Sequence, residues 1–496
     1  MNSKIEPEIT AIDLPEVKAD SWRICPECKG VGKIKRRLRK KVKLRYKLAL
    51  EDFERSNGNG LPPTRPKAHQ EQCKNCKGSG LLPSSYHPVP DSENYPHVSI
   101  IGGGIGGVAL AVACFHRGIP FTIYERDSSF DVRSQGYGLT LQQASKAIEG
   151  LGIFSLKDGV ISTRHVVHTT DGKVIGEWGI RKWLSLDEQT YSKRTNIHIA
   201  RQSLRLALLE QLGGYNNVKW GHQLVEINTS DSKEVNLSFM VNGNLKKVTS
   251  ELVVGADGIR SSVRGLLVGD KKAPLRYLDC IVILGICPLK DLKNLNSELL
   301  DSATVFQTAN GNERIYMMPF TSESVMWQLS FPMLEHEAKK LSESGAIALK
   351  EEAIIRSQWH DPIPQIVAAT DISQISGYPV YDREMMNAET LNKLGNLTLI
   401  GDAAHPMSPF KGQGANQAIL DALSLARGIS KNCRPSSNWK EAGLRRSVLT
   451  KFELDMLERS ASKVKDSAEA ARFLHSEIVL HKADEPRGRS LKKKEG

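Results

Sequence analysis

The amino-acid sequence predicts an α/β fold, and three segments carry this prediction. The mostly apolar stretch 97–101 runs into a turn with glycines at positions 102, 104 and 107. A second apolar stretch, 121–124, ends at Glu125, and a third, 397–400, ends at Gly401 and Asp402. Short apolar runs that stop at glycine or at an acid are typical of strands whose carboxyl ends face a ligand. We therefore expect these segments to contribute to one binding site.

The glycines of the first segment fit a dinucleotide-binding turn. Gly102, Gly104 and Gly107 occupy the glycine positions of a G-x-G-x-x-G pattern. Side chains at these positions would block the turn, the pyrophosphate and the contact between helix and strand. The helix that follows would present free N–H groups and the positive end of its dipole to phosphate. The pattern predicts a Rossmann-like domain.

Glu125 narrows the choice of dinucleotide. It lies eighteen residues after Gly107, at the end of the second apolar stretch. A carboxylate there would accept hydrogen bonds from both hydroxyls of an adenosine ribose and would disfavour a 2′-phosphate. NADP is therefore disfavoured at this site, whereas FAD and NAD both remain open at this point.

Composition and charge set further limits. At 496 residues the chain is long enough for two or three domains, and its longest apolar stretch, near 280–287, is too short to cross a membrane. The first twenty residues contain five acids and no apolar core, so we expect neither a secretory signal nor a transit peptide. The net charge of +12 is local, because ten of the fifteen residues from Lys33 to Lys47 are Lys or Arg. We expect a cytoplasmic protein, with a nuclear location allowed by this basic run.

Two cysteine pairs predict a metal site. Each pair extends into a C-x-x-C-x-G-x-G unit, in which the thiolates face one ion and the glycines let backbone N–H groups fold back towards sulfur. Four thiolates favour zinc, and a redox pair, unliganded cysteines or an iron–sulfur cluster are the alternatives. The units resemble the cysteine-rich zinc domain of J-domain co-chaperones, but that domain has four of them, and this chain has no His-Pro-Asp tripeptide that would imply co-chaperone activity. The expected ligands are Cys25, Cys28, Cys73 and Cys76.

The basic run lies between the two pairs. Ile34, Leu38, Val42 and Tyr46 recur every four residues and predict a two-faced helix. Its cationic face is either a solvated surface or a site for RNA, an anionic membrane or a protein partner. We expect a disordered N-terminus over 1–24, a zinc-binding module over 25–80 and a linker over 81–95.

Two later motifs identify the nucleotide site more closely. A strand over 252–255 leads to Asp257 and Gly258, and the segment 409–416, which follows Gly401 and Asp402, opens a helix. In this order the motifs resemble the single-component, FAD-dependent class A monooxygenases. That family includes aromatic hydroxylases, zeaxanthin epoxidases and tetracycline-inactivating enzymes. The resemblance covers roughly residues 96–430 and implies a flavin domain with an inserted antiparallel sheet over the substrate, mainly within 266–380, followed by C-terminal helices and a basic tail over 431–496.

The resemblance also implies roles for individual residues. Gly102, Gly104, Gly107 and Glu125 would hold the ADP half of FAD, and Arg201 would approach the pyrophosphate or the ribityl chain. Asp257 and Gly258 would connect the FAD region with the path of the pyridine nucleotide, and Asp402 would bind the ribityl chain. Pro409 would lie near the oxygen-reacting face of the flavin. The backbone from Gly412 to Gly414 would sit at its pyrimidine end, where a helix N-terminus stabilises charge on the reduced ring.

The implied reaction is oxygen transfer. NADH or NADPH would reduce FAD, and a flavin hydroperoxide would deliver one oxygen atom from O2 to an aromatic, polycyclic or unsaturated small molecule. The competing hypothesis is a binding protein, in which the module over 25–80 holds a protein client or nucleic acid and the flavin fold is a structural or redox-sensing platform. We interpret His405 as a structural part of its turn. Six residues are candidates for an apolar substrate cavity or for plain core: Met317, Met318, Pro319, Phe320, Trp327 and Phe331.

Overall fold

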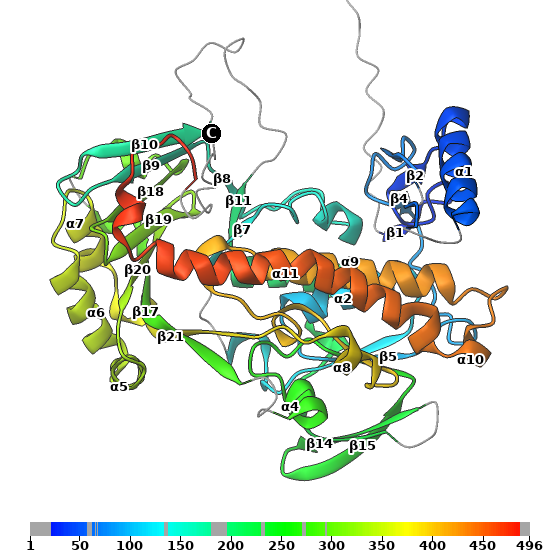
Figure 1. The fold of residues 1–496 in the computed structure, drawn as a ribbon. Coiled ribbons are helices and arrows are strands. Elements are labelled where there is room, and N and C mark those ends of the chain that lie inside the picture. The colour runs from blue at the N-terminus through cyan, green and yellow to red at the C-terminus, as the bar shows by residue number, and fades with distance from the viewer. Residues whose placement is uncertain are drawn as a thin grey trace, which may run out of the picture.

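A computed structural model of the chain describes residues 21–486, apart from 57–61, 65, 67, 133–136, 180–195, 230–233, 270–273 and 293–294. Residues 1–20 and the predicted basic tail therefore lie outside the described residues. The predicted α/β fold is confirmed, with two large sheets joined by a long C-terminal helix (Figure 1).

The first large sheet, called the central sheet here, contains the strands predicted from the sequence. Its order is β12-β6-β5-β16-β22, and all pairings are parallel. Because parallel strands end at the same edge, the residues after β5, β16 and β22 meet there. The strand bounds are Val218–Lys219, Phe121–Tyr124, Val98–Ile101, Leu252–Gly255 and Leu397–Leu399 in the order of the sheet.

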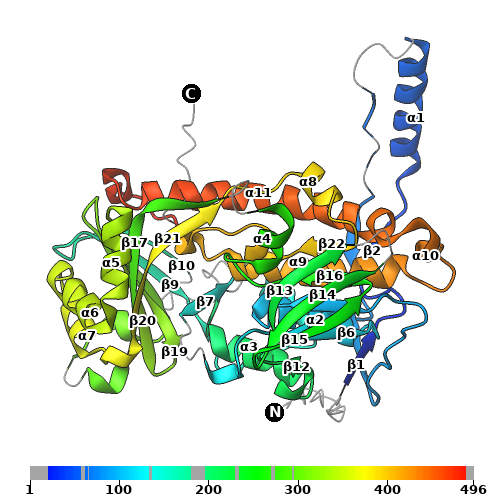
Figure 2. The same cartoon turned by 90° about the horizontal axis from the view of Figure 1, so that it is seen from below.

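Two layers cover the central sheet. Helices α2 (Ile105–Phe115) and α9 (Gly414–Asn432) lie on one face, and the antiparallel strands β13 (Gln223–Thr229), β14 (Val235–Val241) and β15 (Asn244–Ser250) lie on the other (Figures 1 and 2). Helix α2 is apolar on every side and almost entirely buried, as expected for a helix enclosed by the core. Helix α3 (Arg201–Glu210) packs beside it.

The second large sheet, called the outer sheet here, has the order β10-β9-β18-β19-β20-β17-β21. The predicted antiparallel strands over 303–329 are confirmed as β18 (Thr304–Ala309), β19 (Arg314–Thr321) and β20 (Ser324–Pro332). Strands β17 (Leu275–Pro288) and β21 (Ile375–Arg383) follow on one side. Strands β9 (Arg164–His168) and β10 (Val174–Gly179) complete the other side from a part of the chain well before residue 266. Period-two patterns mark a strand but not its neighbours, so the expected range missed these two.

Helices enclose the outer sheet. Three of them cover the face turned away from the central sheet: α5 (Glu335–Glu343), α6 (Gly345–Arg356) and α7 (Ile363–Ala369). Helix α11 (Thr450–Phe473) runs along both halves of the molecule (Figures 1 and 2). Among the described residues, no helix is both long and apolar enough to cross a membrane.

The N-terminal module, residues 21–84, is more ordered than expected. β1 (Ser21–Ile24) pairs with β4 (Leu81–Ser84), although the sequence predicted disorder and a linker at these positions. This pairing brings Cys25 beside Gly80, whose carbonyl accepts a hydrogen bond from the Cys25 N–H, so the strands are needed to bring the cysteine units together. The predicted helix was placed too early. Ile34 lies in β2 (Lys33–Lys35), which pairs with β3 (Gln70–Gln72), and the helix α1 is Lys40–Arg55.

Candidate functional site

The glycine turn after β5 has the close contacts that its pattern predicts. Gly102 has φ +107°, and a Cβ on it would lie 2.6 Å from the carbonyl oxygen of Ala256. A Cβ on Gly107 would lie 1.9 Å from the carbonyl oxygen of Gly102, so α2 can approach the turn only without a side chain there. A Cβ on Gly104 would meet nothing within 4 Å. Gly104 therefore leaves open space at the N-terminus of α2, which fits the approach of a pyrophosphate.

A cavity of about 930 Å³ lies at the carboxyl edge of the central sheet and extends under the outer sheet. This volume is near the upper end of the range usual for ligand sites. Predicted residues from four separate segments line it: Gly104, Arg201, Gly258, Asp402, Pro409, Gly412 and Gly414. The other predicted residues do not line the cavity, and they lie behind the residues that do: Gly102, Gly107, Glu125 and Asp257.

Glu125 contacts the glycine turn directly. One carboxylate oxygen accepts a hydrogen bond of 2.6 Å from the Gly103 N–H, and the other accepts one of 3.0 Å from the Asp127 N–H. The side chain is only 9% exposed. Glu125 therefore braces the turn, and its contact with a ribose stays a prediction.

Asp257 stabilises the turn that carries Gly258. Its carboxylate accepts hydrogen bonds from the Ser261 hydroxyl and, at 3.1 Å, from the Val263 N–H at the start of α4 (Ser262–Val268). Burial raises the pKa of Asp257, whereas these hydrogen bonds act in the opposite direction. Gly258, with φ +79°, is the residue of this motif that lines the cavity.

The turn after β22 is held by a carboxylate that the sequence reasoning did not single out. Asp421, on α9, is 0% exposed and accepts hydrogen bonds from the Gly401 N–H at 2.9 Å and from His405 Nε2 at 2.6 Å. Arg459 on α11 donates a third. His405 is also fully buried and is not a lining residue, in agreement with its interpretation as a structural part of the turn. Asp402 is thereby fixed at the cavity wall.

Arg201 and Asp402 place opposite charges in the cavity. Arg201 opens α3, and its Nη1 donates a 2.6 Å hydrogen bond to the Tyr137 hydroxyl. Burial raises the pKa of Asp402, and the nearby Arg201 opposes that shift. The pair can bind polar groups of a ligand that passes between α3 and the turn after β22.

Asn416 joins two parts of the site and was also missed as a functional residue. Its Oδ1 accepts hydrogen bonds from the Gln142 and Ala144 N–H groups at 2.8 and 3.0 Å. Its Nδ2 donates to the carbonyls of Thr140 and Gly412, both at 2.8 Å. The first-turn position of Asn416 in α9 was visible in the sequence, but its partners Thr140, Gln142 and Ala144 lie about 270 residues away.

Comparison with known proteins identifies the domain. A family model described as "FAD binding domain" matches residues 95–438, which is more than half of the chain. The chain belongs to this FAD-binding family. The predicted resemblance to FAD-dependent monooxygenases is confirmed at this level, and the N-terminal module lies outside the match.

Three members or structural neighbours illustrate the relationship. The chain is 27% identical over 354 residues to chloroplastic zeaxanthin epoxidase of Oryza sativa subsp. japonica, covering 69% of this chain but 50% of that protein, so it spans about half the length of that relative. It is 28% identical over 340 residues to aurachin C monooxygenase/isomerase of Stigmatella aurantiaca, covering 67% of this chain and 80% of that protein. A structure of Klebsiella pneumoniae HpxO complexed with FAD and uric acid shares the fold, with a TM-score of 0.62 at 20% identity over 77% of this chain and 89% of that one.

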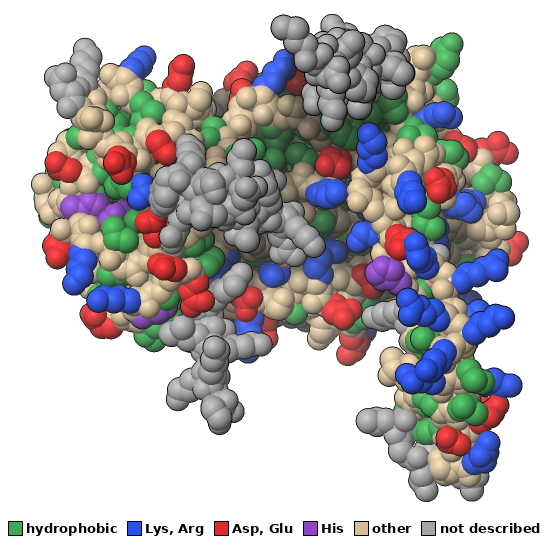
Figure 3. Space-filling view, turned by 90° about the horizontal axis from the view of Figure 1, so that it is seen from above, with side chains coloured by type: hydrophobic (Ala, Val, Ile, Leu, Met, Phe, Trp, Pro, Cys, Tyr) green, Lys and Arg blue, Asp and Glu red, His purple; other side chains and the backbone are tan. Residues whose placement is uncertain are grey.

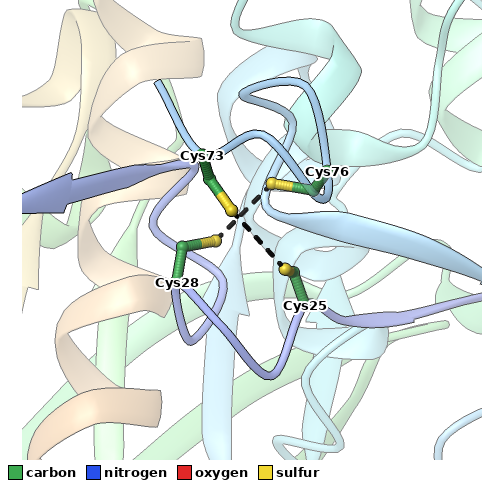
Figure 4. A group of neighbouring side chains, drawn as sticks. All are labelled: Cys25, Cys28, Cys73 and Cys76. Atoms are coloured by element: carbon green, nitrogen blue, oxygen red, sulfur yellow. Dashed lines mark hydrogen bonds between the residues drawn. The ribbon is translucent and has the colours of Figure 1, made fainter. Parts of the chain in front are cut away.

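The four cysteines beside the FAD-binding domain converge as predicted (Figure 4). Their sulfur atoms all lie within 4.8 Å of one another, with Cys25 and Cys73 at 3.9 Å and Cys28 and Cys76 at 3.6 Å. A tetrahedral zinc site with Zn–S bonds of about 2.3 Å requires S–S distances of about 3.8 Å. The Gly32 and Gly80 N–H groups donate to the sulfurs of Cys28 and Cys76 at 3.1 and 3.2 Å. The donor set therefore fits a zinc ion.

Two arginines attach this cysteine cluster to the FAD-binding domain. Arg117, just after α2, and Arg427, on α9, both donate to the carbonyl of Gly30, at 3.3 and 2.9 Å. Burial lowers the pKa of Arg117 to about 9 and that of Arg427 to about 10. Four thiolates around one Zn²⁺ carry a formal charge of about −2, which two guanidinium groups can offset.

Helix α1 projects from the module, and Lys and Arg gather along it (Figure 3). None of its described side chains is buried. The apolar and cationic side chains of α1 are therefore both accessible, and the expected nucleic-acid or protein partner stays a prediction.

Proposed function

We propose that the chain is an FAD-dependent monooxygenase that uses NADH or NADPH and O2 to add one oxygen atom to an aromatic, polycyclic or unsaturated small molecule. The observation that carries this proposal is the meeting of three strand ends of an FAD-binding domain at one cavity, whose other wall is the outer sheet. When bound, FAD would supply the two-electron chemistry that joins NAD(P)H oxidation to oxygen transfer.

The residues of this chain would bind and orient the cofactor. The open space at Gly104 and the N–H groups of α2 would accept the pyrophosphate, and Glu125 would keep the turn in place for the ribose. Arg201 and Asp402 would bind the central part of the cofactor. The N–H groups from Gly412 to Gly414 open α9, and there they would stabilise negative charge on the reduced ring. Pro409 would border the space where O2 and substrate meet.

The outer sheet would exclude water and shape the substrate site. Of the six apolar candidates, Met318 lines the cavity, whereas Met317, Trp327 and Phe331 belong to the core between the outer sheet and its helices. Strand alternation explains the split, because neighbouring residues point to opposite faces. Met326, on the adjacent strand, lines the cavity with Met318.

The proposed activity is tested on the full-length purified protein. We expect it to retain FAD and to consume O2 when NADH or NADPH is added, at a rate that rises with a substrate from a panel of aromatic and polycyclic compounds. Oxygen electrode traces and flavin absorption spectra measure both properties. A protein that neither copurifies with FAD nor rebinds it would end the monooxygenase proposal.

We also propose that the cysteine cluster binds one zinc ion with a structural role. Four protein ligands leave no open position, which is typical of structural zinc. The double variant Cys25→Ser/Cys76→Ser is expected to lose zinc, measured as metal per chain by mass spectrometry, and to unfold at a lower temperature. Cys433→Ser is the control, because Cys433 is buried in the core of the FAD-binding domain, outside the cluster, and its replacement should leave the zinc content near one per chain. An unchanged zinc content in the double variant would refute these ligands.

A further inference from the structure

The cavity-facing side of the outer sheet carries a buried arginine. Arg314 opens β19, is 5% exposed and lines the cavity. Tyr316 and Met318 follow it on the same face, and the alternate residues Ile315 and Met317 lie in the core behind the sheet. A charged residue in an otherwise apolar alternation is unusual, because burial of an unpaired charge is costly.

The guanidinium group of Arg314 is only partly satisfied by the protein. Its Nε donates a 2.7 Å hydrogen bond to Gln307 Oε1, and its central carbon lies 4.9 Å from the ring centre of Tyr316. Within the described part of the chain, no carboxylate pairs with Arg314, and its two terminal nitrogens have no hydrogen-bond acceptor. Burial lowers its pKa to about 10, so the group remains a cation at neutral pH.

Two other arginines in the described residues, Arg445 and Arg264, have acceptors for both of their terminal nitrogens. Arg445 forms an ion pair with Glu453, and Arg264 donates to the backbone carbonyls of Ala403, Ala404 and Glu384. His475, which follows α11 in the chain, lies near Arg314. Its ring hydrogen-bonds the Ser330 hydroxyl at 2.9 Å. Burial, with a contribution from Arg314, lowers the pKa of His475 to about 4, so this ring is neutral and supplies no counter-charge.

A second unsatisfied donor lies in the wall of the same cavity. Gln328, on β20, is 8% exposed and lines the cavity, and its buried Nε2 has no hydrogen-bond partner among the described residues. In the strand register Ser330 pairs with Arg314 and Gln328 pairs with Tyr316. Gln328 is therefore the diagonal neighbour of Arg314, at about 7–8 Å, which is within reach of two long side chains that bind one group.

We propose that Arg314 and Gln328 form a subsite for a carboxylate, or a similar oxyanion, of the substrate. This inference rests on the proposed function, because it assigns the chemical class of the molecule that enters the monooxygenase cavity. An oxyanion there would accept charge-assisted hydrogen bonds from the free end of the guanidinium and a further bond from the amide. Both unsatisfied donors would then be paired.

The sheet also suggests the shape of the acid. From Arg314 the cavity wall follows Tyr316 to Met318, whose side chain reaches Gly138 on β7 (Gly138–Leu141). The four-residue step from Arg314 to Met318 along the extended strand spans about 13 Å. The tyrosine ring and the methionine thioethers suit a flat, unsaturated body. The substrate class is an aromatic or polycyclic acid.

The subsite is tested by binding to the FAD-loaded, full-length protein. Isothermal calorimetry with 2-naphthoate and its uncharged analogue 2-naphthamide compares an acid with an amide of nearly the same shape. For the wild type we expect the acid to bind at least ten-fold more tightly. Arg314→Gln should reduce this preference to less than two-fold, and Arg314→Lys should restore part of it. Lys463→Gln, which removes another cation of the cavity wall, is the matched control and should leave the preference unchanged.

Several outcomes would overturn the subsite. These are equal affinities for acid and amide in the wild type, no detectable binding of 2-naphthoate, a preference that survives Arg314→Gln, or a preference that depends on Lys463. If Arg314→Gln does not fold, the subsite is still tested by the affinities of the wild type and of Arg314→Lys for 2-naphthoate and 2-naphthamide. The result is separate from the proposed function, because the latter fails through absent FAD or absent NAD(P)H-dependent O2 consumption in the same preparation, and calorimetry requires neither reaction.

Discussion

Asp421→Ala is expected to lower the free energy of unfolding by about 3–5 kcal/mol, because removal of one partner of a buried ionic cluster leaves the others unpaired. Asp421 holds the Gly401 N–H, His405 and Arg459 at once, and both Asp421 and His405 are fully buried. The turn with Asp402 would lose its support, so FAD content should fall too. Urea unfolding followed by circular dichroism measures the first effect, and the flavin absorbance of the purified protein measures the second.

Asp455→Ala is the matched control for this variant. Asp455 lies on α11 and pairs with Lys451, but both side chains are more than half exposed. Such pairs contribute about 0–1 kcal/mol. Equal losses for Asp421→Ala and Asp455→Ala would contradict the role assigned to Asp421.

The loss of unfolding free energy in Asp421→Ala should also depend on pH. Burial alone would lower the pKa of His405, but the Asp421 carboxylate outweighs it and raises the pKa above its ordinary value. The stability that the charged pair contributes is therefore complete below about pH 6.5 and is lost as the pH rises through the raised pKa of the folded protein. The difference in the free energy of unfolding between wild type and Asp421→Ala should therefore become smaller as the pH rises above the pKa of His405 in the folded protein.

Gly107→Ala is expected to lower the stability of the fold, whereas Gly104→Ala is expected to lower the affinity for FAD. The new methyl group at 107 would lie 1.9 Å from the carbonyl oxygen of Gly102, so α2 must move away from the turn, and overpacking of this kind costs about 1–3 kcal/mol. The methyl group at 104 would meet no atom of the protein within 4 Å. It would occupy space that the pyrophosphate needs, so we expect an unchanged fold and an FAD affinity at least ten-fold lower.

Thermal unfolding of the flavin-free proteins and titration with FAD separate the two effects. Gly107→Ala should lower the melting temperature before any FAD is added. Gly104→Ala should keep the melting temperature and weaken only the titration. An unchanged FAD affinity in Gly104→Ala would show that the pyrophosphate does not approach this turn.

The parts of the site that sequence reasoning reached are local ones. The glycine turn, the Asp257–Gly258 turn and the Gly401–Asp402 turn each follow directly from a short apolar strand, and a parallel sheet aligns such strand ends without further information. The cysteine units were predictable for a similar reason, since the ligands and the glycines that serve them lie within eight residues.

The parts that were missed depend on distant partners. Asp421 and Asn416 were visible on the predicted helix, but their importance comes from Arg459 and from the backbone near Gln142. The role of Arg314 depends on which face of a strand meets the cavity, and a period-two pattern leaves that choice open. Ser21–Ile24 carries too short a pattern to predict a strand, because its pairing with β4 is imposed by the module that it closes.

Helices α2 and α9 connect the N-terminal module with the cavity of the FAD-binding domain. Each presents its N-terminus to the cavity and reaches the module from its far end, through Arg117 and Arg427 respectively. Trp22 packs on Phe154 with 4.6 Å between ring centres, so the contact extends beyond the arginines. A chain cut before residue 96 would remove the Gly30 carbonyl that accepts hydrogen bonds from both Arg117 and Arg427, and it would expose the ends of α2 and α9 that the module covers. We therefore expect loss of the cysteine cluster to destabilise the FAD-binding domain as well.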